Sequence, residues 1–156
     1  MKMNYKEKLE DFLNRGLIKP QERNFSQIEK LILRAYKDLE VAKINLKIDE
    51  EVAYNYAYLS MLRCGRALLF LKGFRPTDGQ QHKTVIEIVS LILGDEFKDI
   101  IEKFDRMRRK RNQFTYDPFL PVSKEEAENA LKTAENFVKI ISEFIKKESP
   151  QQEFKF

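Results

Sequence analysis

The fold is decided by the stretch at residues 50–72, which reads EEVAYNYAYLSMLRCGRALLFLK. Small and apolar residues recur in it at helical spacing, at Tyr54, Ala57, Tyr58, Met61, Leu62, Gly65, Leu68 and Leu69, with Ala53, Cys64, Ala67 and Leu71 widening that face. A helix that is apolar over so much of its circumference is buried among other elements. The sequence therefore predicts a central helix from Asp49 or Glu50 to about Lys72, in which Gly65 lets another helix approach closely.

Further helices are predicted on both sides of this stretch. Apolar residues keep helical spacing from Ile28 to about Lys47, from Val85 to Leu93, from about Glu96 to Phe114 and from Ala127 to Ile145, and a shorter amphipathic segment covers residues 4–15. No segment has the pattern of a strand. Four principal helices with short connections, one of them broken by a step, predict an all-α fold, an antiparallel up-down bundle of four to five helices.

Several helix ends are marked by residues that satisfy free backbone groups. Ser26 with Glu29 and Ser123 with Glu126 have the spacing of a capping box, in which each side chain accepts a backbone hydrogen bond at the start of a helix. Asp95, directly after a glycine, is placed to cap the helix that carries residues 96–114. These caps divide the bundle into its predicted helices.

The chain of 156 residues is expected to form one domain. Residues 1–25 are expected to form a short helix and a connector, residues 26–147 the bundle, and residues 148–156 a flexible tail. No stretch approaches the ~20 apolar residues of a membrane span. The start does not have the pattern of a signal peptide.

Composition narrows the chemistry that this chain is expected to perform. Cys64 is the single cysteine and His82 the single histidine, so neither a disulfide framework nor a metal-ligand cluster is expected. No phosphate loop or other cofactor motif is present, and no cofactor is expected. Cys64 is interpreted as a small core residue, and the reducing cytoplasm is the expected location. A net charge of +4, from 29 basic and 25 acidic residues, does not by itself require a nucleic-acid partner.

The basic charge is concentrated in one segment, residues 106–112, which reads RMRRKRN. On its helix the apolar stripe passes through Phe97, Ile100, Ile101, Phe104, Met107 and Phe114, and Arg108 and Arg111 lie where that stripe continues. The other three cations, Arg106, Arg109 and Lys110, are expected on the opposite, solvated side. Arg108 and Arg111 are therefore the residues whose placement needs a specific reason.

Two interpretations of Arg108 and Arg111 stay open. An arginine on a core-facing side needs a carboxylate, carbonyl groups, an anion or a subunit interface. Both side chains either join helices through acidic residues such as Asp38, Glu40 or Asp117, or line a groove for a phosphate or a partner chain. Arg66, with Arg63, is a further candidate for the wall of such a groove.

These residues together resemble the HEPN superfamily of helical bundles. The resemblance covers roughly residues 26–146. It is carried by the helix containing Ala53–Tyr58 and Arg66–Leu69, by the loop Gly73–Pro76 followed by His82, and by the pair Arg111–Asn112 at the end of the penultimate helix. The resemblance implies a HEPN-like bundle that forms a homodimer.

In nuclease members of that superfamily, an arginine, commonly followed by asparagine, is separated from a later histidine by four to six intervening residues. The resemblance implies that these groups from two subunits meet in a cleft and cleave RNA without a metal. Arg111 and Asn112 match, but Tyr116 occupies the position expected for histidine after four intervening residues. A phenol, with an ordinary pKa of ~10, is a poorer proton carrier near neutral pH than imidazole. His82 matches a histidine near the loop in many members and is expected to make a structural hydrogen bond to that loop.

The leading hypothesis is a dimer whose arginine-rich groove binds RNA or a nucleotide-bearing partner, in a toxin–antitoxin or stress and defence context that the resemblance implies. One alternative is a non-catalytic module that docks a separate nucleotidyltransferase. Another is a metal-independent ribonuclease that uses Tyr116 in place of histidine. The candidate catalytic residues are Arg111, Asn112 and Tyr116, and the candidate RNA- or partner-binding residues are Arg66, Arg106, Arg108, Arg109, Lys110 and Arg111.

Overall fold

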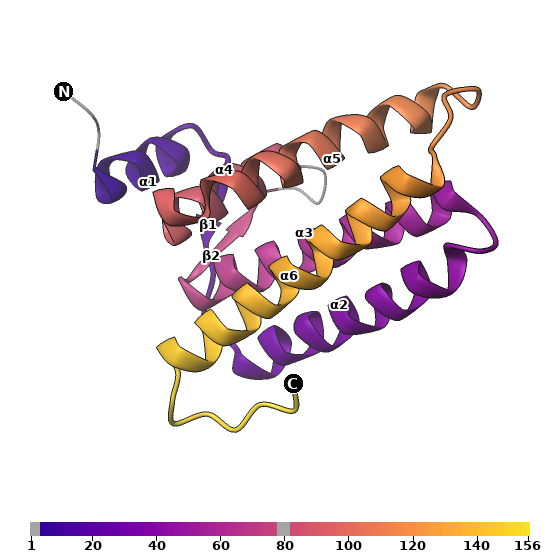
Figure 1. Ribbon diagram of the computed structural model, residues 1–156. Coiled ribbons are helices and arrows are strands. Elements are labelled where there is room, and N and C mark those ends of the chain that lie inside the picture. Colours follow the sequence, from indigo (N-terminus) through magenta and orange to yellow (C-terminus); the bar gives the residue numbers. More distant parts are fainter. Residues whose placement is uncertain (1–3, 78–81) are drawn as a thin grey trace.

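The central element of the fold is helix α3 (Glu50–Leu71), which packs against α2, α4, α5 and α6 (Figure 1). The computed structural model describes residues 4–77 and 82–156. Its elements in chain order are α1 (Tyr5–Asn14), β1 (Ile18–Pro20), α2 (Phe25–Asn45), α3, β2 (Phe74–Pro76), α4 (His82–Leu93), the 3-10 turn η1 (Asp95–Phe97), α5 (Lys98–Tyr116) and α6 (Lys124–Glu148). The predicted all-α bundle with a central helix is confirmed.

Most helix boundaries lie where the sequence placed them, but two of the predicted caps are wrong. Asn24 caps α2, its Oδ1 accepting a hydrogen bond from Gln27 N at 3.1 Å, so Ser26 lies inside the helix. Asn is as effective an N-cap as Ser, and it comes first. Asp95 opens the 3-10 turn, and α5 begins at Lys98 after Phe97, which makes no side-chain cap. The capping box of Ser123 and Glu126 is confirmed.

Two short strands, which the sequence did not predict, join the N-terminal segment to the loop that precedes α4. β1 and β2 are antiparallel, with Ile18 opposite Pro76 and Pro20 opposite Phe74. Strands of three residues are too short to show the alternation by which a strand is recognised. Gln21 N donates to Gly73 O at 2.8 Å, which extends the contact beyond the strands. The connector within residues 1–25 therefore holds the chain shortly before His82.

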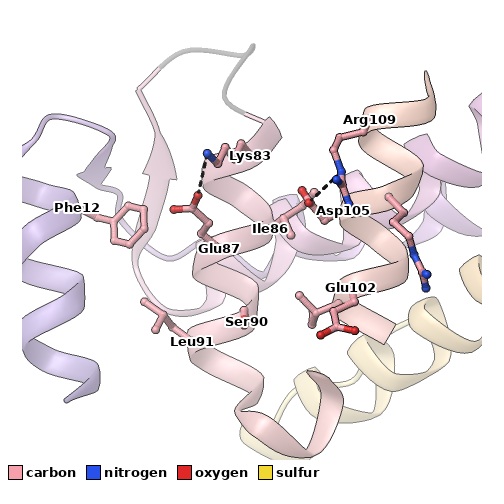
Figure 2. Close-up of a pocket in the computed structure, with 11 residues that line it drawn as sticks. Phe12, Lys83, Ile86, Glu87, Ser90, Leu91, Glu102, Asp105 and Arg109 are labelled. Carbon is pink, nitrogen blue, oxygen red and sulfur yellow. Dashed lines mark ion pairs between the residues drawn. The ribbon is translucent and has the colours of Figure 1, made fainter. Parts of the chain in front are cut away.

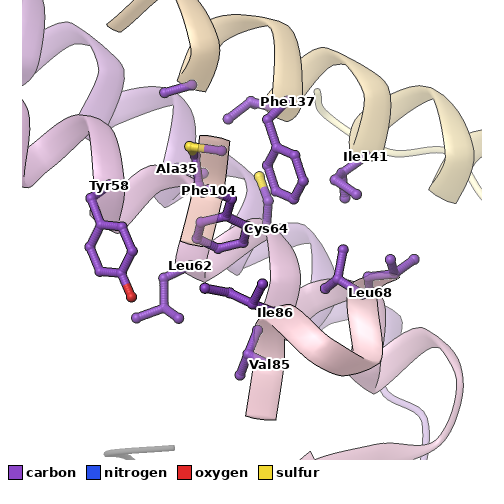
Figure 3. Packing of buried hydrophobic residues seen from close by; sticks show 14 of the residues in the cluster. Ala35, Tyr58, Leu62, Cys64, Leu68, Val85, Ile86, Phe104, Phe137 and Ile141 are labelled. Atoms are coloured by element: carbon purple, nitrogen blue, oxygen red, sulfur yellow. The ribbon is translucent and has the colours of Figure 1, made fainter. Parts of the chain in front are cut away.

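The core lies between α2, α3, α4, α5 and α6 (Figure 3). The ring of Phe104 on α5 is 5.8 Å from the ring of Tyr58 and 5.1 Å from that of Phe137, between centroids. The close approach predicted at Gly65 is present, since a Cβ there would lie 2.7 Å from Val85 Cγ1 on α4. Cys64 is buried in this core as predicted, and burial raises the pKa of its thiol.

The segment after α6, predicted as a flexible tail, lies against α2 and α6 with defined contacts (Figure 1). The ring of Phe154 is 6.1 Å from that of Phe25, and Phe156 stacks on Phe154 at 4.8 Å. The backbone N–H of Lys155 donates to Glu29 Oε2 at 2.9 Å. These contacts cover the start of α2. Among the residues that the structure describes, no helix is both long and apolar enough to cross a membrane.

Candidate functional site

The basic segment of α5 divides between two sides of the helix. Arg108 is 17% exposed and Arg109 is 59% exposed, as their positions relative to the apolar stripe predict. Lys110 was predicted to be solvated, and this is wrong, because its side chain is only 23% exposed. Its ammonium group lies 3.2 Å from Glu126 Oε2 and donates to Pro121 O at 3.3 Å. Lys110 therefore joins α5 to the start of α6.

Arg106 and Arg109 line a groove of about 540 Å³ between α1, α4 and α5 (Figure 2). Carboxylates accompany them there. Asp105 Oδ2 is 3.4 Å from Arg109 Nε, and Glu87 Oε1 is 3.9 Å from Lys83 Nζ. Glu102 also lines the groove. Three cations and three carboxylates line this groove, so the lining has no excess of positive charge with which to attract an anion.

Arg111 lies on the other side, where it is held by neutral groups. Its Nε donates to Asn55 Oδ1 on α3 at 3.1 Å. Its Cζ lies 6.0 Å from the centroid of the Tyr58 ring, at the outer limit of a cation–π contact. Neither Asn55 nor Tyr58 carries a negative charge here, because burial raises the pKa of the Tyr58 phenol. The guanidinium is thus held in position by neutral groups, and no carboxylate of the described residues forms an ion pair with it.

The carboxylates proposed from the sequence as partners of Arg108 and Arg111 are not their partners. Among the ion pairs between described residues, Arg108 pairs with Asp105 of its own helix at 3.0 Å. Asp38 is fully buried and pairs with Arg34 and Arg63. Neither Glu40 nor Asp117 pairs with Arg108 or Arg111 in the described part of the chain. Of the two open interpretations, the one in which these acids join the two arginines to other helices is wrong for Asp38, which lies on α2 and pairs with Arg34 of α2 and Arg63 of α3.

His82 begins α4 and hydrogen-bonds to Tyr58. Residues 78–81 of the loop, to which a structural hydrogen bond of His82 was predicted, lie outside the described residues. The Tyr58 hydroxyl and His82 Nδ1 are 2.9 Å apart, and their rings are 5.8 Å apart. Burial raises the pKa of Tyr58, so its hydroxyl keeps its proton, and which of the two groups donates depends on the tautomer of the imidazole. Burial first, and then the charges of Arg111, Arg66 and Arg108 in that order, together lower the pKa of His82 to about 4.

The open part of this site is a groove of about 430 Å³ at the end of α5. Its lining is formed by α3 and by the last turn of α5 with the residues beyond it: Glu51, Val52, Asn55, Tyr56, Arg111, Phe114, Thr115 and Pro118. Tyr116 is not part of this lining and is 87% exposed. Five residues along a helix turn a side chain by about 140°, which directs Tyr116 away from Arg111. Asn112 is half-buried and also lies outside the lining.

Sequence reasoning missed Asn55 and Tyr58 as residues of the site. A signal for Asn55 was present, because it is an amide in a helix that is otherwise apolar over most of its surface. Asn55 and Arg66 are 11 residues apart, close to three whole helical turns, so both lie on one face of α3. Tyr58 could not be distinguished from a core residue by its position, since it is one, with its ring fully buried.

The fold and the arginine site define this chain as a helical bundle with a fixed cationic group at the end of its penultimate helix. The family model of the HEPN domain matches residues 28–145. The chain therefore belongs to the HEPN family, which associates it in general with RNA-related or nucleotide-binding functions. No curated protein matches the sequence. Within the described ranges 4–77 and 82–156, no group of His, Cys, Asp and Glu side chains is placed to hold a metal ion.

Proposed function

We propose that this HEPN protein is a homodimer that binds RNA through the groove around Arg111, in a toxin–antitoxin or stress and defence setting. The observation that carries the proposal is the neutral support of Arg111. A guanidinium paired with a carboxylate is already satisfied, whereas one held by an amide and an aromatic face keeps its charge for a ligand. Arg108 and Arg66 add positive charge around Tyr58.

The geometry of Arg111 suits a phosphate group. Its Nε is engaged with Asn55, and the two Nη groups carry the remaining four of the five N–H donors that a guanidinium offers. A planar pair of donors matches two phosphate oxygens, and such charge-assisted hydrogen bonds are about twice as strong as neutral ones. Holding the guanidinium in place beforehand lowers the entropy that binding would otherwise lose.

The test compares two variants that each lose one arginine. Arg111→Ala is expected to weaken binding of single-stranded RNA about tenfold, measured by fluorescence anisotropy at several salt concentrations. The slope of log affinity against log salt is expected to fall by about 0.7, the value for one phosphate contact on a single strand. The matched control is Arg15→Ala on α1, whose guanidinium is 3.4 Å from Asp11. Equal affinities for the two variants would contradict the role of Arg111.

The oligomeric state has its own measurement. The chain has a mass of 18.6 kDa, so light scattering after size exclusion separates a monomer from a dimer of twice that mass. The proposed homodimer is expected across the micromolar range. A monomer at all these concentrations would remove this part of the proposal and leave the test of Arg111 unaffected.

Catalysis is not part of the proposal. A ribonuclease that uses Tyr116 requires this phenol to meet Arg111, and within one chain Tyr116 lies outside the groove that Arg111 lines. Incubation of the purified protein with a broad RNA panel and a chelator measures this alternative directly. Metal-independent cleavage that is lost in Tyr116→Phe would establish the alternative in place of simple binding.

A second candidate function, docking of a separate nucleotidyltransferase, is favoured by the aromatic side chains beyond α5. Tyr116 is 87% exposed and Phe119 is 90% exposed, and exposed aromatics are enriched where proteins meet. A nucleotidyltransferase gene adjacent to the gene for this protein would support this candidate. Phe119→Ser is expected to abolish co-purification with that partner and to leave RNA affinity unchanged. Retained co-purification would exclude Phe119 as an anchor.

A further inference from the structure

A second groove, separate from the one that Arg111 lines, lies between the neighbouring helices α5 and α6 (Figure 1). Its volume is about 710 Å³, and its lining consists of Tyr54, Lys103, Arg106, Met107, Glu126, Asn129, Ala130, Lys132 and Thr133. Tyr54, Met107 and Ala130 are buried and form an apolar floor, while the charged side chains are exposed and form the rim. The groove around Arg111 shares none of these residues.

The rim of this groove carries an excess of positive charge. Lys103 and Arg106 stand on α5, and Lys132 stands on α6. None of these three cations forms an ion pair with a carboxylate of the described residues, although Arg106 also borders the charge-balanced groove at α1. The one carboxylate of the lining is Glu126, whose Oε2 already lies 3.2 Å from Lys110 Nζ. Three cations and one carboxylate leave an excess of two positive charges on the lining.

The floor of the groove offers a hydroxyl that has no partner in the described part of the protein. Tyr54 is 6% exposed, and its hydroxyl takes part in none of the hydrogen bonds between described residues. Its ring packs edge-to-face with Phe114, 5.6 Å between centroids, which fixes the side chain. The hydroxyl is not one of the fully enclosed polar atoms, so solvent reaches it. A nearly buried donor without a partner costs free energy, and a ligand that accepts its hydrogen bond removes this cost.

The charged residues of the rim act directly on this phenol. Burial first, and then the charge of Glu126, raise the pKa of Tyr54 to about 12, against the opposing charge of Arg106. Because Glu126 and Arg106 both line the groove, their influence indicates that the hydroxyl is directed toward it. At neutral pH the hydroxyl keeps its proton and is a donor.

A phosphate group with more than one negative charge fits this combination of groups. A carboxylate carries a single charge, whereas a phosphomonoester carries about −1.5 to −2 charges at pH 7 and has three strong acceptor oxygens. The cations come from two helices that face each other across the groove, so they can reach different oxygens of one group. Asn129 and Thr133 add neutral donors beside them.

We propose that the groove between α5 and α6 binds a phosphomonoester or diphosphate group, which pairs with Lys103, Arg106 and Lys132 and accepts a hydrogen bond from the Tyr54 hydroxyl. This site goes beyond the proposed function, because no residue of the Arg111 groove takes part in it. Such a group is supplied either by the 5′ end of an RNA or by a free small phosphate compound, and the binding chemistry is the same for both.

The first test uses inorganic pyrophosphate and isothermal titration calorimetry at low salt. Tyr54→Phe removes only the hydroxyl, and it is expected to weaken binding about tenfold, as for the loss of one hydrogen bond to a charged group. The same variant is expected to keep the stability of the wild type in urea, because the hydroxyl has no partner in the fold. An unchanged affinity in Tyr54→Phe, or no binding by the wild-type protein, would overturn the inference.

A matched pair of lysine variants tests the rim. Lys132 and Lys139 are both exposed on α6, but Lys139 lies outside the lining of the groove. Lys132→Ala is expected to weaken pyrophosphate binding about fivefold at low salt, as for the loss of one charge near the surface. Lys139→Ala is expected to bind as the wild type does. Equal losses in the two variants would mean that pyrophosphate follows the general charge of the protein, and the inference would fail.

Oligouridylate with and without a 5′-phosphate distinguishes the two sources of the group. A gain in affinity from the 5′-phosphate that is lost in Tyr54→Phe assigns the groove to an RNA end, and pyrophosphate binding without such a gain assigns it to a free small phosphate compound. Arg111→Ala is expected to leave pyrophosphate affinity unchanged. If Arg111→Ala abolished it, pyrophosphate would occupy the proposed RNA groove and the inference would be overturned. RNA affinity that is unchanged in Arg111→Ala would instead remove the proposed function alone.

Discussion

Two clusters of arginine side chains flank α3, and they differ in what holds them. On the α2 side, Arg34 and Arg63 both contact Asp38, with Arg34 Nε 3.2 Å from Asp38 Oδ1. On the α5 side, Arg111 is held by the amide of Asn55 and the ring of Tyr58. The first cluster contains a fully buried carboxylate, whereas the second surrounds a neutral histidine.

The difference separates a structural arginine cluster from a candidate binding one. A buried carboxylate is costly without partners, so Arg34 and Arg63 are expected to contribute to the stability of the fold. Burial raises the pKa of Asp38, and both guanidinium groups oppose that rise. Arg111 contributes less to folding, because its partners are neutral groups that lose little when it is removed. Its placement therefore has its main consequence in binding.

The largest expected effect is a loss of stability on removing the buried carboxylate of the structural cluster. Asp38→Ala leaves Arg63 and Arg34 without their carboxylate in a half-buried position, and it is expected to lower the free energy of unfolding by about 3 kcal/mol. Arg111→Ala is expected to cost less than about 1 kcal/mol. Urea denaturation followed by circular dichroism measures both. If both variants lose a similar free energy of unfolding, the distinction between a structural cluster at Asp38 and a binding cluster at Arg111 is contradicted.

A smaller effect is expected at Gly65, which sets the distance between α3 and α4. An added Cβ would lie 2.7 Å from Val85 Cγ1, and valine has little rotamer freedom with which to give way. Overpacking costs about 1–3 kcal/mol, against about 1 kcal/mol of improved helix propensity for alanine over glycine. Gly65→Ala is therefore expected to lower stability by about 1 kcal/mol.

The same variant also distinguishes the two clusters. A shift of α4 moves His82 relative to Tyr58, so the NMR pKa of His82 is expected to change in Gly65→Ala. The Asp38 cluster joins α2 to α3 and is not displaced. A variant more stable than the wild type, with an unchanged His82 pKa, would contradict the close contact of α3 and α4.

The smallest expected effect is the pH dependence of stability from His82. Its pKa is about 4 in the folded chain and ~6.5 when unfolded, so the unfolded state takes up the proton first. Stability from this group is present above pH ~6.5 and is lost as the pH falls toward 4. The difference in the free energy of unfolding between the wild type and His82→Gln, measured against pH, separates the contribution of His82 from that of the carboxylates. A difference in stability between the two proteins that stays constant from pH 7.5 to pH 4.5 would contradict the lowered pKa of His82.

Much of the fold follows from local pattern. The central helix was predicted from Asp49 or Glu50 to about Lys72, and the structure places it at Glu50–Leu71 with Asp49 as its cap. The strands were not predictable, because a three-residue pair is stabilised by its partner segment and not by its own sequence. Asn24 was overlooked as a cap because Ser26 and Glu29 also fit the pattern two residues later.

The sequence by itself determined which faces of the helices are buried, and it placed Arg108 and Arg111 on the core-facing side of α5. It determined this because helical periodicity is a local property. Only the tertiary structure decided what these arginines meet. Asp38, Asn55, Tyr58 and His82 were all available in the chain, and their choice of partner depends on how α2, α4 and α5 are arranged around α3. On one side of α3, Arg63 thus pairs with the carboxylate of Asp38, whereas on the other side Arg111 contacts the amide of Asn55 and the ring of Tyr58.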